Sequence, residues 1–111
     1  MSSPRFSAGE VVLLTFPFTG VLGAKRRPAL VLLDAGDEDI LVARITSALA
    51  RSAFDVKVQN WRGAGLLLPL VVRLHKLATL EKRLVARMLG ALGAEDRDAV
   101  RGVLATMWTA L

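Results

Sequence analysis

Apolar residues in the first 90 positions of this chain occur in short runs of strand length, and Gly, Pro or Asp residues separate several of these runs. Runs of this length and spacing predict β-strands. The expected strands are residues 11–16, 28–33, 40–46, 54–58, 70–77 and 83–89. From Glu95 onward the apolar residues follow the 3.6-residue period of an amphipathic helix. Its expected buried face holds Val100, Val103, Leu104, Met107, Trp108 and Leu111.

Many short strands followed by one helix predict a fold that is mainly β with a C-terminal α-helix. The expected architecture is a small, curled, largely antiparallel sheet or a partly open barrel. At 111 residues the chain has the length of a single domain, which we place at residues 1–111.

The later strands alternate between apolar and polar residues, which predicts one buried and one exposed face for each. The expected buried side chains include Phe54, Val56, Leu74, Leu84, Ala86 and Met88, and the expected exposed ones are Asp55, Lys57, Arg73, His75, Arg83 and Arg87. The exposed faces are therefore expected to be strongly basic.

Composition excludes several classes of site. The chain has no Cys and one His, so disulfides, thiolate zinc sites and multi-His metal clusters are excluded, and we expect metal-independent chemistry without a cofactor. The longest apolar run, residues 63–72, is shorter than the roughly 20 residues of a membrane-spanning helix, so no membrane association is expected. No signal peptide is apparent before Glu10, and the expected location is the cytoplasm.

The net charge of +5 is concentrated in the second part of the chain. Residues 1–50 hold five Lys or Arg and five Asp or Glu, whereas residues 51–111 hold ten and five. A basic surface suits a polyanion such as nucleic acid, although it also serves solubility.

The stretch Lys25-Arg26-Arg27-Pro28 leads three cations into an apolar strand. Proline fits the first position of a strand and favours an extended conformation for the residue before it, so Arg27 is expected to be held at the entrance of the strand. A loop is expected over residues 17–26. Guanidinium donors match phosphate oxygens, which makes the stretch a candidate phosphodiester site. From these residues alone, a solvated basic loop is the simpler interpretation.

Four stretches together resemble the MazF/PemK family of toxins from bacterial toxin–antitoxin systems. They are residues 9–13 with 16–19, residues 25–32, residues 45–47 and residues 71–80. The resemblance implies an SH3-like barrel that forms a homodimer and cleaves single-stranded RNA without a metal. It also implies a cognate antitoxin as partner, and DNA binding together with that antitoxin.

In the family the catalytic pair is an Arg before a Pro and a Thr or Ser at the end of a following strand. The resemblance therefore implies catalytic roles for Arg27 and Thr46. Arg27 would stabilise the charged phosphorane and assist the leaving 5′-oxygen, while Thr46 would position the phosphate. The expected RNA-binding residues are Lys25, Arg26, Arg44, Ser47 and His75.

One departure from the family pattern concerns the general base. Some members carry a carboxylate in the first loop, where this chain has Val21-Leu22-Gly23-Ala24, so the base is unassigned. His75 stands where relatives often have an acidic residue, and histidine is the side-chain type that titrates near neutral pH. Two interpretations of His75 stay open, a surface residue and an acid or base.

Two other functions are compatible with the same fold. Related toxins poison DNA gyrase through a Trp near the C-terminus, a position that Trp108 occupies here, although its spacing with Leu104 and Leu111 favours a core or interface role. A catalytically inactive barrel that binds RNA or a partner is the third possibility. Assays of RNA cleavage and of supercoiling separate the three.

Overall fold

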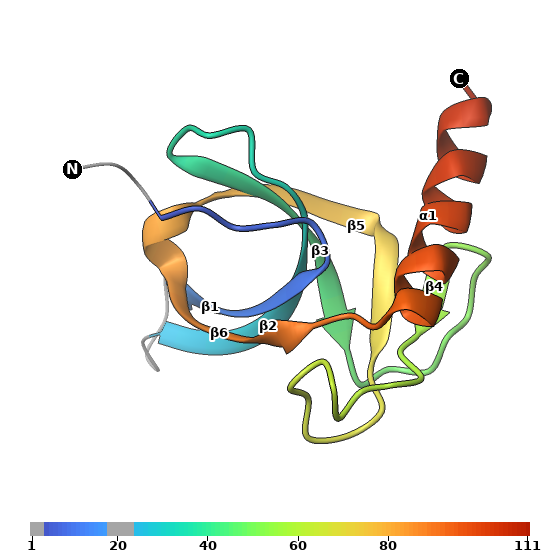
Figure 1. Ribbon diagram of the computed structural model, residues 1–111, viewed down its shortest axis with the longest axis horizontal. Helices are drawn as coiled ribbons and strands as arrows, with labels where there is room; N and C mark the ends of the chain where they lie inside the picture. The colour runs from blue at the N-terminus through green and yellow to red at the C-terminus, as the bar shows by residue number, and fades with distance from the viewer. Residues whose placement is uncertain (1–3, 18–23) are drawn as a thin grey trace.

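The computed structural model describes residues 4–17 and 24–111. Its elements are β1 Glu10–Pro17, β2 Ala24–Leu33, β3 Asp39–Thr46, β4 Asp55–Lys57, β5 Val71–Glu81, the 3₁₀ turn η1 Lys82–Leu84, β6 Val85–Ala91 and α1 Ala94–Thr109 (Figure 1). The strands form one antiparallel sheet in the order β4-β5-β3-β2-β1-β6. The prediction of a mainly β fold with a C-terminal helix is confirmed.

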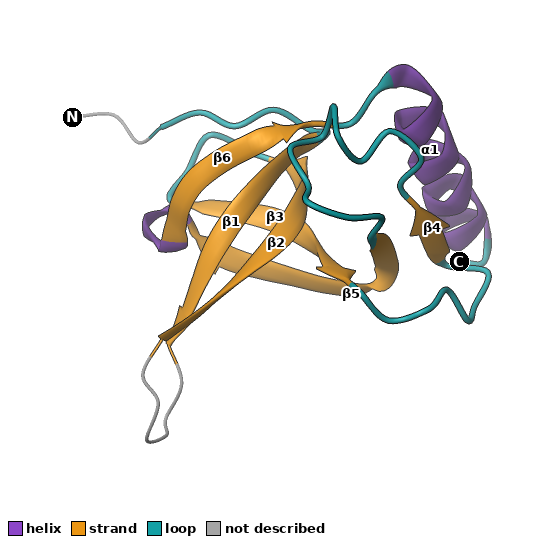
Figure 2. Cartoon of the chain, turned by 90° about the horizontal axis from the view of Figure 1, so that it is seen from below, coloured by secondary structure: helices purple, strands orange, loops and turns teal. Residues whose placement is uncertain are grey.

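The sheet curls back on itself, as Figures 1 and 2 show from two directions. At one end η1 joins β5 to β6, and at the other edge the short β4 lies beside α1. Among the described residues β4 and β6 share no strand pairing, so the barrel is open between them.

One face of the sheet encloses an apolar group that we call the inner cluster. It consists of Val12, Leu14, Ala29, Val31, Ile40 and Val42, with Phe6, Leu80, Leu84 and Val85 packed against them. Strands that are not neighbours in the sheet, such as β5 and β1, contribute to this one cluster. The inner cluster therefore fills the interior of the curl.

The opposite face carries a second group, the helix-side cluster, which α1 and the segment 58–70 cover. Its buried members are Val11, Leu30, Ala43, Ile45, Val56, Val58, Ala64, Leu66, Leu70, Val72, Leu74, Leu92 and Val100. Because strand side chains alternate between faces, neighbouring residues such as Val42 and Ala43 belong to different clusters.

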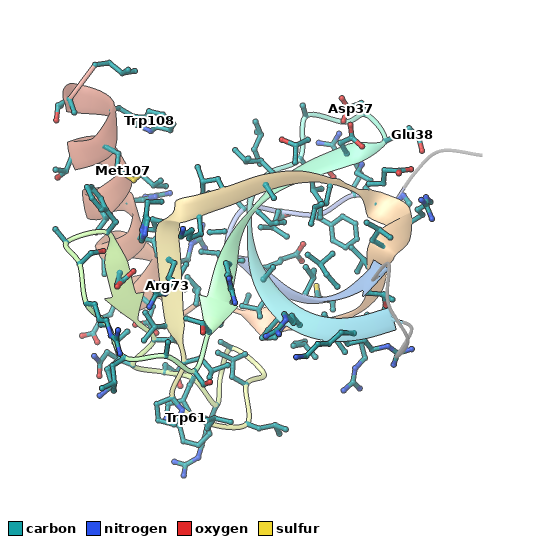
Figure 3. All side chains as sticks on the ribbon, turned by 180° about the vertical axis from the view of Figure 1, so that it is seen from behind. Asp37, Glu38, Trp61, Arg73, Met107 and Trp108 are labelled. Carbon is teal, nitrogen blue, oxygen red and sulfur yellow. The ribbon has the colours of Figure 1, made fainter. Side chains whose placement is uncertain are left out.

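The helix packs on the sheet through Val100, with Val103, Leu104 and Met107 partly buried against the helix-side cluster. The prediction that Trp108 and Leu111 share this buried face is wrong, because Trp108 is 57% exposed and Leu111 is fully exposed. The last turn of α1 extends beyond the edge of the sheet, which leaves these side chains exposed (Figures 1 and 3).

The segment 58–70 is fixed by two contacts that the sequence did not reveal. Asp96 of α1 is buried, and its carboxylate accepts hydrogen bonds from the backbone N–H groups of Gln59 and Asn60, each 2.9 Å long. The backbone around Ala64 also approaches Gly90 of β6, where a Cβ would lie 2.6 Å from the Ala64 carbonyl carbon. Trp61 packs partly buried on the helix-side cluster, with the Arg62 guanidinium 4.5 Å from its ring centroid.

The predicted burial of one strand is wrong. Met88 of β6 is 54% exposed, and Ala86 is exposed as well. The pairing of β6 with β1 shifts twice, between Val11 and Val12 and again between Leu13 and Leu14. Such bulges insert residues into one strand and redirect its side chains, so strict alternation fails here.

Candidate functional site

The inner faces of β2 and β3 change from apolar to polar toward the same end of the sheet. On β2 the inner face runs from Val31 through Ala29 to Arg27, and on β3 it runs from Val42 to Arg44 and Thr46. Because the two strands are antiparallel, the N-terminal part of β2 and the C-terminal end of β3 meet at this end. Cationic and hydroxyl side chains therefore gather where the inner cluster stops.

The strand register aligns the two predicted catalytic residues. Ala29 pairs with Arg44 as the last registered pair of the β2–β3 ladder. Arg27 and Thr46 each lie two residues beyond that pair, on the same face, because side chains two apart in a strand point the same way. The structure thus brings Arg27 and Thr46 to one end of one sheet face.

The start of β2 differs from the sequence prediction. The strand begins at Ala24, and Lys25, Arg26 and Arg27 pair with β1, so Arg27 lies within the strand and not at its entrance. Of the loop predicted over residues 17–26, Pro17 belongs to β1 and residues 24–26 belong to β2, and residues 18–23 lie outside the described part. Pro28 is tolerated because β3 pairs with β2 only from Ala29 onward, which leaves Pro28 unpaired on that side.

Alternation separates the three cations of this stretch. Lys25 and Arg27 share the inner face of β2, whereas Arg26 pairs with Thr15 and points to the opposite face. Lys25 and Arg26 are exposed, and Arg27 is half-buried. The structure therefore places Lys25 with the predicted site and sets Arg26 apart from it.

Charged residues also form a row across three strands. Asp55 of β4 pairs with Arg73 of β5, and Arg73 pairs with Arg44 of β3. Directly paired residues share a face, so the row extends the cationic region sideways from Arg27 and Thr46. Figure 3 shows Arg73 on β5, at the side of the sheet that faces β4. Sequence reasoning counted Arg73 as an exposed basic residue and did not assign it to the site.

Two side chains of the site form hydrogen bonds to the backbone of the residues that follow β3. The Thr46 Oγ1 accepts a hydrogen bond of 3.2 Å from the N–H of Ala48, which leaves the hydroxyl proton available to a ligand. The Arg73 guanidinium donates to the carbonyl of Leu49 at 3.4 Å. Ser47, between these contacts, is exposed.

Asp55 was predicted to lie on an exposed face, and this prediction is wrong. Its side chain is fully buried, and its Oδ2 accepts hydrogen bonds from the N–H groups of Arg51 (2.8 Å) and Ser52 (3.1 Å). These bonds, the Arg51 bond foremost, together with the charges of Arg73 and His75, hold the pKa of Asp55 below its ordinary value although burial opposes them. The sequence signal was Ser52 three residues before Asp55, a spacing typical of side chains that close a turn on backbone N–H groups.

His75 lies next to this carboxylate. Its Nδ1 is 4.0 Å from Asp55 Oδ1, and 34% of its side chain is exposed. The Phe54 ring packs against the imidazole with a centroid separation of 5.6 Å. The expectation that His75 points away from Leu74, which is fully buried, is confirmed.

Residues 7–108 match the family of PemK-like, MazF-like toxins of type II toxin–antitoxin systems. The chain belongs to this family. The resemblance seen in the sequence is therefore confirmed, and the match spans all the elements from β1 to the last turns of α1.

Solved structures share the fold of this toxin. MazF from Deinococcus radiodurans (Form-I) has a TM-score of 0.71 at 27% identity, covering 96% of this chain and 99% of that one. A MazE-MazF structure from the same organism (Form-II) has a TM-score of 0.72 at 28% identity, covering 96% and 97%. An endoribonuclease from a Mycobacterial species, in complex with its cognate antitoxin, has a TM-score of 0.73 at 19% identity, covering 92% and 93%. No curated protein matches the toxin's sequence.

Two further findings concern the described residues of the toxin. Within residues 4–17 and 24–111, no three His, Asp or Glu side chains come together as a metal site would require. No helix in this part of the chain is long and apolar enough to span a membrane.

Proposed function

We propose that this toxin is an endoribonuclease that cleaves single-stranded RNA by attack of the ribose 2′-hydroxyl, without a metal. The observation that carries the proposal is the position of Arg27 and Thr46 at one end of one sheet face, beside the Arg44–Arg73 row. A phosphodiester at this end would meet three guanidinium groups and one hydroxyl. Membership of the MazF-like family and the endoribonuclease activity named for the Mycobacterial relatives support the same reaction.

The reaction creates negative charge at phosphorus, and the site offers donors to meet it. In the proposed mechanism Arg27 donates hydrogen bonds to the nonbridging oxygens of the dianionic phosphorane and to the departing 5′-oxygen. Fixed charged donors of this kind stabilise the transition state more than the ground state. The Thr46 hydroxyl donates a hydrogen bond to a nonbridging oxygen and so holds the phosphate in line for attack. The product would carry a 2′,3′-cyclic phosphate.

The remaining predicted contacts bind RNA in this proposal. Lys25, Arg44 and Ser47 lie around Arg27 and Thr46, and His75 lies next to the Arg73 end of the row. Arg26, on the other face of β2, would contribute affinity through the RNA backbone. Phosphate contacts make binding dependent on salt, so the affinity for RNA should fall as ionic strength rises.

The chemistry is tested with a 5′-labelled single-stranded RNA and purified protein in excess EDTA. Cleavage to a fragment with a 2′,3′-cyclic phosphate is expected. A matched RNA with one 2′-deoxy nucleotide at the cleaved position should stay intact, because it lacks the attacking hydroxyl. Cleavage of the deoxy-substituted RNA would contradict the mechanism, and inhibition of gyrase supercoiling without any RNA cleavage would favour a gyrase poison.

We also propose an antitoxin partner, with which the toxin would bind DNA, and the cytoplasm as the location. The Deinococcus radiodurans relative has been solved as MazE-MazF, and a Mycobacterial endoribonuclease has been solved in complex with its cognate antitoxin. On this chain the exposed Lys25 and the half-buried Arg27 offer cations to an acidic, partly apolar segment on one face of β2, and the exposed Arg26 offers one on the other face. Such a segment would exclude RNA by occupying the same cations.

A homodimer is the third part of the proposal. Several large apolar side chains are exposed on the single chain: Leu33, Leu49, Leu67, Leu68, Met88, Trp108 and Leu111. Exposed apolar side chains in such number favour an association that covers some of them. Light scattering at micromolar concentration should report twice the chain mass of 12.0 kDa. A monomer under these conditions would contradict this part.

A further inference from the structure

One buried carboxylate oxygen in residues 4–17 and 24–111 has no hydrogen-bond partner, and it is Oδ1 of Asp55. The other oxygen of the same group already accepts two backbone N–H bonds, from Arg51 and Ser52. An ionised carboxylate only accepts hydrogen bonds, and a buried acceptor without a donor is costly. The two bonds to Oδ2 fix the orientation of the carboxylate, and Oδ1 is therefore held in a fixed position without a donor of its own.

The imidazole of His75 comes within ion-pair range of Oδ1, although the charge of Arg73 acts on Asp55 more strongly. Its Nδ1 is 4.0 Å from Oδ1, a distance that is longer than a hydrogen bond but that a small movement of the ring closes. The Phe54 ring packs against the imidazole at a centroid separation of 5.6 Å. Since Nδ1 is directed at Asp55, Nε2 on the other edge of the ring points away from the carboxylate.

We propose that Asp55 is a positioning residue that holds His75 in the Nδ1–H tautomer, so that Nε2 acts as the general base of RNA cleavage. The inference rests on the proposed function and supplies the base that the first loop of this chain lacks. In the step, the 2′-oxygen bonds to phosphorus, its proton moves to Nε2, and the bond from phosphorus to the 5′-oxygen breaks. The 5′-oxygen leaves with a proton from water, and the imidazolium returns its proton to solvent.

His75 has both cations and a carboxylate in its surroundings. Arg73 and Lys76 lie on the same strand, and Arg44 pairs with Arg73 from β3. Asp55 is the acidic group that faces His75 from β4. Its charge favours the imidazolium, and as the proton arrives at Nε2 the contact from Nδ1–H to Oδ1 becomes a charge-assisted hydrogen bond.

The tautomer can be measured directly because the chain has a single histidine. In the wild-type protein with ¹⁵N-labelled histidine, two-bond ¹⁵N–¹H correlations above neutral pH should show the proton on Nδ1. A proton on Nε2 would overturn the inference. This measurement needs neither RNA nor a variant, so its result is independent of the proposed function.

The variant Asp55→Asn sharpens the test. Its amide oxygen can still accept the N–H bonds of Arg51 and Ser52, but its NH₂ group then faces Nδ1 and requires Nδ1 to be the acceptor. The expected result is a switch to the Nε2–H tautomer. Asp98→Asn, which removes an exposed carboxylate from α1, should keep the wild-type tautomer.

Kinetics then connect the tautomer to the reaction. Asp55→Asn and His75→Ala should each lose about 10²-fold or more in cleavage rate, the usual contribution of a positioned general base. Both should also lose the limb of the pH–rate profile near neutral pH, which Asp98→Asn should retain. An unchanged profile in Asp55→Asn would overturn the inference, whereas a wild-type protein that cleaves no RNA would overturn the proposed function and leave the tautomer result standing.

Discussion

Arg27 and Thr46 lie on neighbouring antiparallel strands, each two residues beyond the Ala29–Arg44 pair and on the same face of the sheet. The inner cluster ends at Ala29 along β2 and at Val42 along β3, so both side chains lie beyond the apolar part of their own strand. This relationship, and not the basic composition of the chain, is what indicates a phosphodiester site.

The role of Thr46 predicts a graded series of variants. Thr46→Val keeps the shape and removes the hydroxyl, so it should lower the cleavage rate about 3- to 10-fold, as expected for one neutral hydrogen bond. Thr46→Ser restores the donor and should recover most of the rate. If Ser and Val variants were equally impaired, the methyl packing of Thr46 would matter and its hydroxyl would not.

The close approach of segment 58–70 to β6 predicts a stability effect at Gly90. A Cβ there would lie 2.7 Å from the Ala64 carbonyl oxygen, and both partners are backbone. Gly90→Ala should therefore lower the free energy of unfolding by about 1–3 kcal/mol, the usual cost of overpacking. Urea denaturation measures it.

Gly102 is the matched control for this experiment. It lies in α1, and a Cβ added there would have nothing within 4 Å beyond the helix's own backbone. Gly102→Ala should therefore raise the free energy of unfolding by about 0.5–1 kcal/mol through helix propensity. Equal effects of the two substitutions would show that the contact between Ala64 and Gly90 is not tight in solution.

A buried ion pair predicts how stability depends on acid. Asp34 accepts N–H bonds of 2.8 Å from Phe6 and from Gly36, and Lys82 Nζ lies 3.0 Å from its Oδ1. The Phe6 bond foremost, with the Gly36 bond and the ion pair to Lys82, lowers the pKa of Asp34 to about 2 against the opposing effect of burial. A pKa that is lower in the folded state stabilises the protein above the unfolded-state pKa, and this stabilisation is lost as pH falls toward 2.

Asp34→Asn should therefore be less stable than the wild type at pH 7 and should lose less stability between pH 4 and pH 2. Urea denaturation at a series of pH values measures both effects. Parallel stability curves for the two proteins over this pH range would contradict the assignment.

The cationic surface predicts how an antitoxin binds. Its affinity for the toxin should fall with added salt, and the triple variant Lys25→Ala/Arg26→Ala/Arg27→Ala should bind it more weakly. Isothermal titration at two salt concentrations measures both. An unchanged affinity in the triple variant would place the inhibitory contact elsewhere on the toxin.

Much of the fold follows from local sequence rules. The turn at Gly36, which adopts a φ of +94°, and the apolar run of β3 are sufficient to predict the hairpin that brings Thr46 to the same end of the sheet as Arg27. The 3.6-residue period predicts the helix to within a few residues. These signals are local, because a turn residue or an apolar period acts through its immediate neighbours in the chain.

The parts that sequence could not predict depend on contacts between distant segments. Asp55 alternates with apolar residues like any exposed strand residue, and only the fold of residues 51–55 buries it under backbone N–H groups. Asp96 fits the first turn of a helix, but its partners lie more than 30 residues away at Gln59 and Asn60. Trp108 continues the helical period, yet its exposure is decided by where the sheet ends.

The central claim is that Arg27 meets the charge that develops on the scissile phosphate. Its most direct test is the single-turnover rate of RNA cleavage in excess EDTA for the wild type, Arg27→Ala and the control Arg83→Ala, which removes an exposed guanidinium paired with Glu81. Arg27→Ala should be slower by about 10²–10³, the usual loss for one oxyanion stabiliser, while Arg83→Ala should cleave like the wild type. Undiminished cleavage by Arg27→Ala would contradict the account.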